Sequence, residues 1–303
     1  MKKTKIILNA IFELLKETFS SFSENKVMKL SASLAYYTIF SMGPLLIVII
    51  SLCGLLFSKQ AVEGKLYAIL KNFVGSDTAF SLQTMIERVG KDDQSFIAGI
   101  IGFVVLMLGA TSIFSEIQDS INIIWGIQAK PKKNWIKYLQ NRFLSFSVIV
   151  SLGFLLLITL LISSLIEMVS NNLSLYFPNT TIIVFYVINL LLTIFISTLI
   201  FGTIFKVLPD ARIKWKDIFA GALVTSVLFL IGKFAISFYI SHTDVGSAFG
   251  AAGSLVVLLV WAYYSSVILY LGAEFTKAYA SKYGGEIHPN NYAVKVQIVR
   301  IEK

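Results

Sequence analysis

Charged, cysteine and histidine side chains are scarce in this sequence of 303 residues. Only 14% of the residues are charged and 56% are hydrophobic, whereas a soluble domain carries about a quarter charged residues. The single cysteine, Cys53, excludes an intramolecular disulfide and any site with several cysteine ligands. The two histidines, His242 and His288, are isolated in the chain, so the sequence predicts no metal site and no cofactor.

The sequence contains long blocks of apolar residues with few or no charges. About 20 apolar residues cross a hydrocarbon layer as a helix, and the chain contains six blocks near that length. The sequence therefore predicts an all-α polytopic membrane protein. The six predicted spans are residues 34–57, 96–115, 143–167, 182–205, 218–241 and 247–273. They form a membrane domain over 31–281, between an amphipathic surface helix at 1–30 and a polar, poorly ordered tail at 282–303.

The basic residues alternate along the segments between these spans. With both ends inside the cell, the inner segments hold 20 lysines and arginines and the outer segments hold five. Because basic residues favour the cytoplasmic side, we expect both termini to be cytoplasmic. The formal charge of +9 is explained by these loops, and no nucleic-acid partner is predicted.

Small residues at two places predict how the spans pack and bend. Gly246, Gly250 and Gly253 open the last span, with the first two spaced as GxxxG, a pattern that lets helices approach closely. Gly43 and Pro44 lie near the middle of the first span. Proline removes a backbone hydrogen bond and clashes with the preceding turn, so we expect a kink there.

Polar residues follow the second span on one helical face. At about 100° per residue, Glu116, Asp119 and Asn122 share a face with Ser112 and Ser115, opposite a stripe of isoleucines. Two interpretations stay open. The face is either the wet side of a helix that emerges into the cytosol or the mouth of a water-filled cavity.

Two further charges are candidates for a transport pathway. Lys233 is the only charge well inside a span, where a charge costs roughly 2.5–3.5 kcal/mol and usually faces the bundle or water. It either forms an ion pair with Glu167 or Asp244 or extends to the interface, or it contacts a substrate. Glu274 either marks the cytoplasmic boundary or forms an inner gate with Glu116 and Asp119.

Several segments together resemble the YihY/BrkB family, also described as virulence factor BrkB. They are SASLAYYTIFSMGPLL (31–46), IFSEIQDSINIIWGI (113–127), LPDARIKWKDIFAGALVTSVLFLIGKF (208–234) and GSAFGAAGSLVVLLVWAYYSSVILYLGAEFTKAYA (246–280). The resemblance implies a six-helix protein of the bacterial inner membrane. Some members of the family are linked to envelope integrity or serum resistance, and at least one looks like a route for lipid A precursors. The family supplies no agreed catalytic or binding residues.

Three hypotheses for function follow. The leading one is a transporter or flippase for an anionic lipid or an envelope precursor. The second is a membrane scaffold for envelope assembly that transports nothing. The third is an intramembrane enzyme, but the sequence contains no nucleophile–base or metal arrangement that would support one. The family also carries a ribonuclease label, and the sequence lacks the clustered metal ligands that a metal-dependent ribonuclease needs. We expect no enzyme, membrane lipids as partners and no ATP hydrolysis, because GxxxxGK[ST] is missing. Association into a homo-oligomer stays open.

Overall fold

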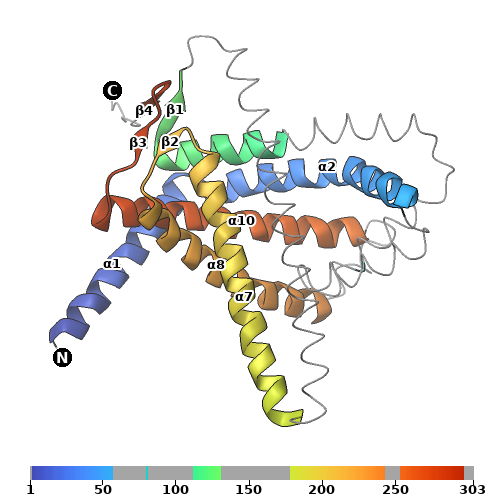
Figure 1. The fold of residues 1–303 in the computed structure, drawn as a ribbon. Helices are drawn as coiled ribbons and strands as arrows, with labels where there is room; N and C mark the ends of the chain where they lie inside the picture. The colour runs from blue at the N-terminus through green and yellow to red at the C-terminus, as the bar shows by residue number, and fades with distance from the viewer. Residues whose placement is uncertain (1, 57–79, 81–111, 131–177, 243–252, 297–303) are drawn as a thin grey trace. The chain divides into compact units, whose positions relative to one another are not determined.

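The computed structural model describes residues 2–56, 80, 112–130, 178–242 and 253–296, and it is mostly helical there. The helices are α1 (Lys2–Glu24), α2 (Val27–Leu56), α7 (Pro178–Val207), α8 (Trp215–His242) and α10 (Gly253–Tyr283), and residues 112–125 form a further helix (Figure 1). The predictions for residues 96–111, 143–167, Gly246 and Gly250 lie outside the described residues.

Three of the described helices are long and apolar enough to cross a membrane. The qualifying segments are Val187–Val207, Trp215–Ile236 and Leu255–Tyr283. They lie on the last three spans that the sequence predicts. The total of six spans and the cytoplasmic side of both termini stay predictions.

The chain divides into two compact units, which are described separately. The first comprises Met1–Phe19, Ile121–Val227 and Gly272–Lys303. The second comprises Ser20–Ser120 and Leu228–Leu271. The boundary between the units falls within α1, α8, α10 and the helix at 112–125, so these helices contribute to both.

Four short strands in the first unit depart from the all-helical prediction. β1 (Ile127–Ala129) pairs antiparallel with β4 (Ala293–Lys295), and β2 (Ala211–Arg212) pairs with β3 (His288–Pro289), as Figure 1 shows. Strands of two or three residues are too short to give a readable alternation in sequence. The poorly ordered tail predicted at 282–303 is therefore wrong for residues 282–296, which complete α10 and provide β3 and β4.

A glycine directs the chain from the helix at 112–125 into β1. Gly126 has a positive φ of 66° and donates its backbone N–H to the carbonyl of Ile123 at 3.1 Å. A left-handed residue directly after the last helical turn is a common helix end. Its carbonyl accepts a bond of 2.8 Å from the backbone N–H of Val296, so the same turn begins the pairing with the C-terminal segment.

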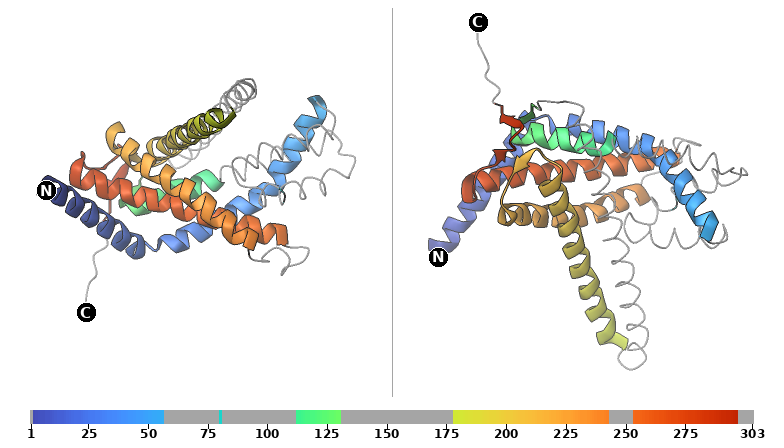
Figure 2. Two further views of the ribbon diagram at one scale, coloured as in Figure 1. Left: turned by 90° about the horizontal axis from the view of Figure 1, so that it is seen from below. Right: turned by 45° about the horizontal axis from the view of Figure 1, so that its top comes forward.

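Within the first unit, α8 and α10 approach so closely that glycine is needed on both helices. A Cβ on Gly221 would lie 1.8 Å from Oγ1 of Thr276, and one on Gly272 would lie 1.9 Å from Oγ1 of Thr225. Each glycine thus receives a threonine of the other helix, and Figure 2 shows the two helices crossing. Gly253, which the sequence assigned to helix packing, is a buried residue that begins α10.

The second unit contains α2, the C-terminal part of α8 and the N-terminal part of α10. Gly232 is the close-approach residue here, because its Cβ would meet the hydroxyl of Tyr264 at 1.5 Å. Phe229 packs edge-on against Trp261, with 6.3 Å between ring centroids. α2 runs as one helix through Gly43 and Pro44, and Figure 2 shows that its direction changes along its length. That the bend lies at Pro44 stays a prediction.

Candidate functional site

Five residues of the first unit, here called the helix-end cluster, lie near the end of the helix at 112–125; four of them make the polar contacts described below, and Glu274 follows Ala273 in α10. The five residues are Asn122, Trp125, Asp210, Glu274 and Lys277. Asn122 and Asp210 are 5% and 3% exposed. The Asn122 Nδ2 donates to Oδ2 of Asp210 at 2.9 Å, and the Asp210 backbone N–H donates to Oδ1 of Asn122, also at 2.9 Å. Two reciprocal bonds satisfy polar groups that would be costly to bury alone.

Two more bonds join the end of this helix to α10. The buried indole Nε1 of Trp125 donates to the carbonyl of Ala273 at 3.0 Å. The Lys277 Nζ donates to the carbonyl of Ile124 at 2.6 Å. The last carbonyls of a helix have no partner inside the helix and lie at the negative end of its dipole. A lysine from another helix therefore both satisfies and neutralises this end.

The C-terminal segment contacts the turn that holds Asp210. The backbone N–H of Asn290 donates to the carbonyl of Asp210 at 2.9 Å, and Arg212 donates to Oδ1 of Asn291 at 2.7 Å. The register of β2 and β3 places Arg212 opposite His288. The turn at 208–213 is thus held by the helix at 112–125 on one side and by residues 288–291 on the other.

Glu274 is the most buried ionisable residue of the cluster. Its side chain is 0% exposed, and α10 continues beyond it to Tyr283. A carboxylate that only marks a water boundary would be exposed, so the burial argues against that interpretation. Ionisable groups buried in membrane helices are costly, and they mark functional sites more often than other buried residues do.

The residues of the predicted polar face differ in burial in the structure. Asp119 is exposed and Glu116 is half-buried, whereas Asn122 is buried against Asp210. Ile117, Ile121 and Ile124 are buried, as the opposite stripe predicted. Asn122 therefore belongs to the packed side of the helix. A gate formed by Glu116, Asp119 and Glu274 stays a prediction.

Lys233 is half-buried in the part of α8 that belongs to the second unit. Its two candidate partners, Glu167 and Asp244, lie outside the described residues. Whether Lys233 is ion-paired or contacts a substrate therefore stays a prediction. Among the residues that the structure describes, no group of three or more His, Cys, Asp or Glu side chains is placed to hold a metal ion.

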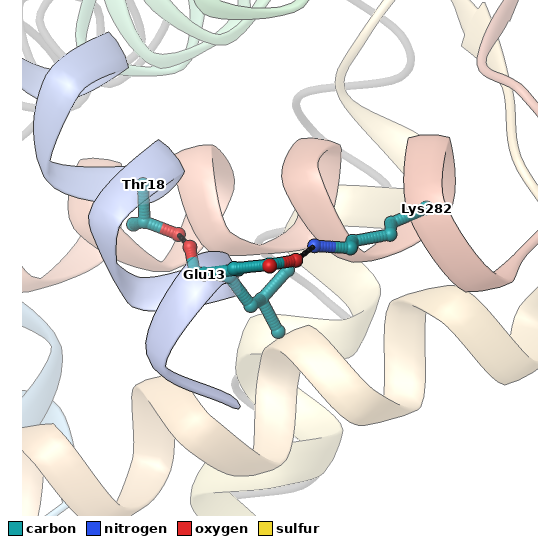
Figure 3. A network of polar contacts seen from close by, with 4 residues as sticks. Glu13, Thr18 and Lys282 are labelled. Carbon is teal, nitrogen blue, oxygen red and sulfur yellow. Dashed lines mark hydrogen bonds and ion pairs between the residues drawn. The ribbon is translucent and has the colours of Figure 1, made fainter. Parts of the chain in front are cut away.

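An ion pair joins α1 to the end of α10 within the first unit (Figure 3). Nζ of Lys282 lies 2.5 Å from Oε2 of Glu13. This hydrogen bond and the lysine's charge hold the pKa of the Glu13 carboxyl below its usual value. One turn along α1, the buried Thr18 donates to the carbonyl of Leu14 at 2.8 Å. The two side chains show that α1 has a face in contact with protein.

Sequence reasoning found Asn122 and Glu274 but missed Asp210, Trp125 and Lys277 as members of the cluster. The available signal was local: Asp210 follows a proline in a turn between two spans, and Trp125 precedes the glycine that ends a helix. Side chains at such positions lie close to helix ends, where backbone groups need hydrogen-bond partners. Their partners lie 88 to 153 residues away in the chain, so no local pattern identifies them.

Apolar helices of spanning length, joined at their ends by buried polar contacts, define a helical membrane protein. A family model described as Virulence factor BrkB matches residues 18–296. The chain belongs to that family.

Curated relatives support the same classification. A UPF0761 membrane protein of Pseudoalteromonas atlantica is 27% identical over 246 residues, covering 80% of this chain and 78% of the relative. One from Alteromonas mediterranea is 24% identical, covering 91% and 92%. One from Chlorobium chlorochromatii is 28% identical, and the match covers 81% of this chain but only 54% of that longer protein. No solved structure shows a significant match.

Proposed function

We propose that this protein moves an anionic lipid or an envelope precursor across the bacterial inner membrane, without catalysing a reaction. Glu274 carries the proposal, because a fully buried carboxylate in a helix of spanning length is costly to keep unless it serves a function. The family membership and the apolar helices agree with a membrane-embedded pathway.

The environment of Glu274 suggests how such a pathway operates. Tyr270, one turn earlier on α10, is also fully buried, so two polar groups lie on one internal face of this helix. Lys277 lies one turn later and donates to the end of the helix at 112–125. A change in the charge state of Glu274 would alter the electrostatics next to that contact, which couples the pathway to the packing of two helices.

Reconstitution into vesicles tests the proposal. A fluorescent anionic phospholipid in the inner leaflet becomes accessible to an added membrane-impermeant reductant when it moves outward. We expect wild-type protein to accelerate this movement and Glu274→Gln, which keeps the shape and removes the charge, to slow it. Glu286→Gln is the matched control, because Glu286 is an exposed carboxylate outside the helices.

Two results would contradict the proposal. One is Glu274→Gln protein that folds normally and moves lipid at the wild-type rate. The other is a lack of protein-dependent movement across a panel of anionic and zwitterionic lipids. The second result would favour the scaffold, which the reciprocal Asn122–Asp210 bonds also suit because they hold the loops in one arrangement.

A further inference from the structure

The connection between α7 and α8 has an unusual balance of exposed charge. Residues 206–217 contain four basic residues and two acidic ones, and the structure describes all of them. Asp210 and Asp217 are both 3% exposed and hydrogen-bonded. Arg212, Lys214 and Lys216 are exposed, and Lys206 is half-buried. The outer surface of this connection is therefore positive, because its carboxylates are directed inward.

Aromatic side chains lie directly beside these cations. Trp215, the first residue of α8, is 54% exposed, and Phe219, one turn later, is 45% exposed, with 5.8 Å between their ring centroids. Nζ of Lys206 lies 5.4 Å from the centre of the Trp215 ring and donates to the carbonyl of Ile213 at 2.7 Å. The ring and the ammonium group are thus held together by a cation–π contact. Arg212, Lys214, Lys216, Lys206, Trp215 and Phe219 are called the basic aromatic patch below.

An apolar stripe continues from the patch along α8. Leu223 and Val227 are exposed and lie on the same side of the helix as Phe219. Ile218, Ala222 and Thr225 on the other side are fully buried. From Trp215 to Val227 the helix rises about 18 Å at 1.5 Å per residue. Since one leaflet supplies about half of a hydrocarbon core that is about 30 Å thick, this stripe is long enough for the acyl chains of one lipid whose headgroup lies at the patch.

We propose that the basic aromatic patch binds the headgroup of an anionic phospholipid whose acyl chains lie along the stripe of α8. The phosphate would be held by Lys214 and Lys216, and Trp215 would lie at the boundary between headgroup and chains, where tryptophan is favoured. The cations and the apolar stripe follow one another along α8 in the same order as the charged headgroup and the acyl chains of a phospholipid. This site concerns lipid bound to the outside of α8, so it does not depend on lipid movement across the membrane.

Nearby acidic groups leave the patch positive. Among the described residues, β3 brings Glu286 into the neighbourhood, since Arg212 pairs in register with His288. The Glu286 carboxylate is 3.7 Å from the ammonium group of Lys295, which neutralises it. Arg212 donates to Asn291 and Lys206 donates to the carbonyl of Ile213. Lys216 and Lys214 are exposed, although the Lys214 side chain lies beside Gly285, so these two cations are left to contact a phosphate.

Quenching of tryptophan fluorescence tests the site in the full chain. The protein is reconstituted in vesicles of phosphatidylcholine and phosphatidylglycerol, in which one of the two lipids carries brominated acyl chains. The contribution of Trp215 is the difference between wild-type protein and Trp215→Phe, which isolates one of four tryptophans. We expect brominated phosphatidylglycerol to quench Trp215 at a lower mole fraction than brominated phosphatidylcholine does.

Charge removal provides the decisive comparison. Lys214→Gln/Lys216→Gln should reduce the preference for phosphatidylglycerol by roughly fivefold per lysine, the fold-change equivalent to about 1 kcal/mol per surface cation. Lys16→Gln/Lys29→Gln, which removes two exposed lysines of α1 and α2, should keep the preference. Because all four side chains are exposed, we expect both variants to fold.

Three results with the wild-type protein and the Lys214→Gln/Lys216→Gln variant would overturn the proposal. They are equal quenching by the two lipids in wild-type protein, a preference that Lys214→Gln/Lys216→Gln leaves unchanged, and a preference in wild-type protein that does not fall as salt is raised. The last follows because contacts between exposed charges are screened by salt. Loss of the preference in the control pair as well would show a general effect of net charge and would also refute the site.

Discussion

Adding one methyl group to Gly221 should destabilise the crossing of α8 and α10. The new Cβ would lie 1.8 Å from Oγ1, 2.8 Å from Cβ and 3.2 Å from Cα of Thr276. Rotation of the threonine side chain relieves only the first contact, and it breaks the bond of 2.7 Å that Oγ1 donates to the carbonyl of Gly272. The contacts with Cβ and the backbone remain, so Gly221→Ala must move one helix relative to the other.

The magnitude follows from two opposing terms. Alanine is a better helix former than glycine by about 1 kcal/mol. Forcing an additional methyl group into a packed core costs about 1–3 kcal/mol, and the backbone contact places this site at the upper end. We therefore expect a net destabilisation of roughly 1–2 kcal/mol for Gly221→Ala. Gly272→Ala should behave similarly, because its Cβ would lie 1.9 Å from Oγ1 and 2.9 Å from Cβ of Thr225.

Gly202 on α7 supplies a matched control. Its Cβ would meet Ala222 and Ile218 at 3.8 Å, an ordinary contact distance. Gly202→Ala should therefore gain helix propensity without overpacking and leave stability unchanged or raise it by up to about 1 kcal/mol. The measurement is thermal unfolding of purified protein in detergent, followed by the loss of the monodisperse peak in size-exclusion chromatography.

The double variant Gly221→Ala/Thr276→Gly decides whether the threonine is responsible. If it is, the second substitution should recover part of the stability that the first removes, which gives a coupling energy between the two sites. Gly221→Ala that unfolds at the temperature of wild type, or that is destabilised no more than Gly202→Ala, would refute the close approach of the two helices.

Three further predictions concern the helix-end cluster and α1. Asn122→Ala should lower the free energy of unfolding by about 1–3 kcal/mol, because it leaves polar groups of Asp210 buried without the Asn122 amide. Asn122→Asp should be more destabilising, since it places two carboxylates together. Wild-type unfolding temperatures for both variants would contradict the Asn122–Asp210 pair. Trp125→Phe keeps an aromatic ring but loses the indole N–H and part of the buried ring volume. Unfolding should therefore show a loss of at least about 1 kcal/mol, and no loss would mean that the bond to α10 is dispensable. The ion pair with Lys282 lowers the pKa of the Glu13 carboxyl from its ordinary value of 4.5. The pair therefore stabilises the fold fully at pH values above 4.5, and this stabilisation is lost as the pH falls through the lowered pKa. Unfolding temperatures of wild type and Glu13→Gln should therefore converge on acidification, and a constant difference would argue against the pair.

The sequence predicted the long helices well because their signal is local. The helical periodicity that placed Glu116, Asp119 and Asn122 on one face is matched by a helix over residues 112–125. α7 and α8 begin three or four residues before the predicted spans and end within two residues of them. Apolar blocks give helix length directly, and each residue contributes to the pattern independently of any distant contact. α2 and α10 are the exceptions, since α2 begins at Val27, before the predicted start at 34, and α10 continues past the predicted end at 273 to Tyr283.

Helix packing was harder to predict, because a close approach depends on two helices. The GxxxG spacing directed attention to Gly246 and Gly250, whereas the described contacts use Gly221, Gly232 and Gly272. Each of these is an isolated glycine that receives the side chain of a partner helix. A sequence pattern on one helix shows where close approach is permitted. It does not show which residue of another helix fills the space.

Asn122 illustrates the same limit for polar residues. Its angular position placed it at one edge of a face shared with Glu116 and Asp119. Asp210, which is 88 residues further along the chain, decides the outcome, because it satisfies both polar ends of the amide. A polar residue at the edge of a helical face is buried when such a partner exists and exposed when none does.

The C-terminal strands extend this reasoning to the function. β4 pairs with β1 and β3 pairs with β2, so residues 288–295 contact the chain directly after the helix at 112–125 and again between α7 and α8. Within the first unit, the ends of these helices therefore cannot separate without breaking backbone pairing or moving together with the C-terminal segment. If lipid or precursor passes near Glu274, the simpler motion keeps this end intact, because a two-residue strand pair and the Asn122–Asp210 bonds would otherwise be lost and remade in every cycle.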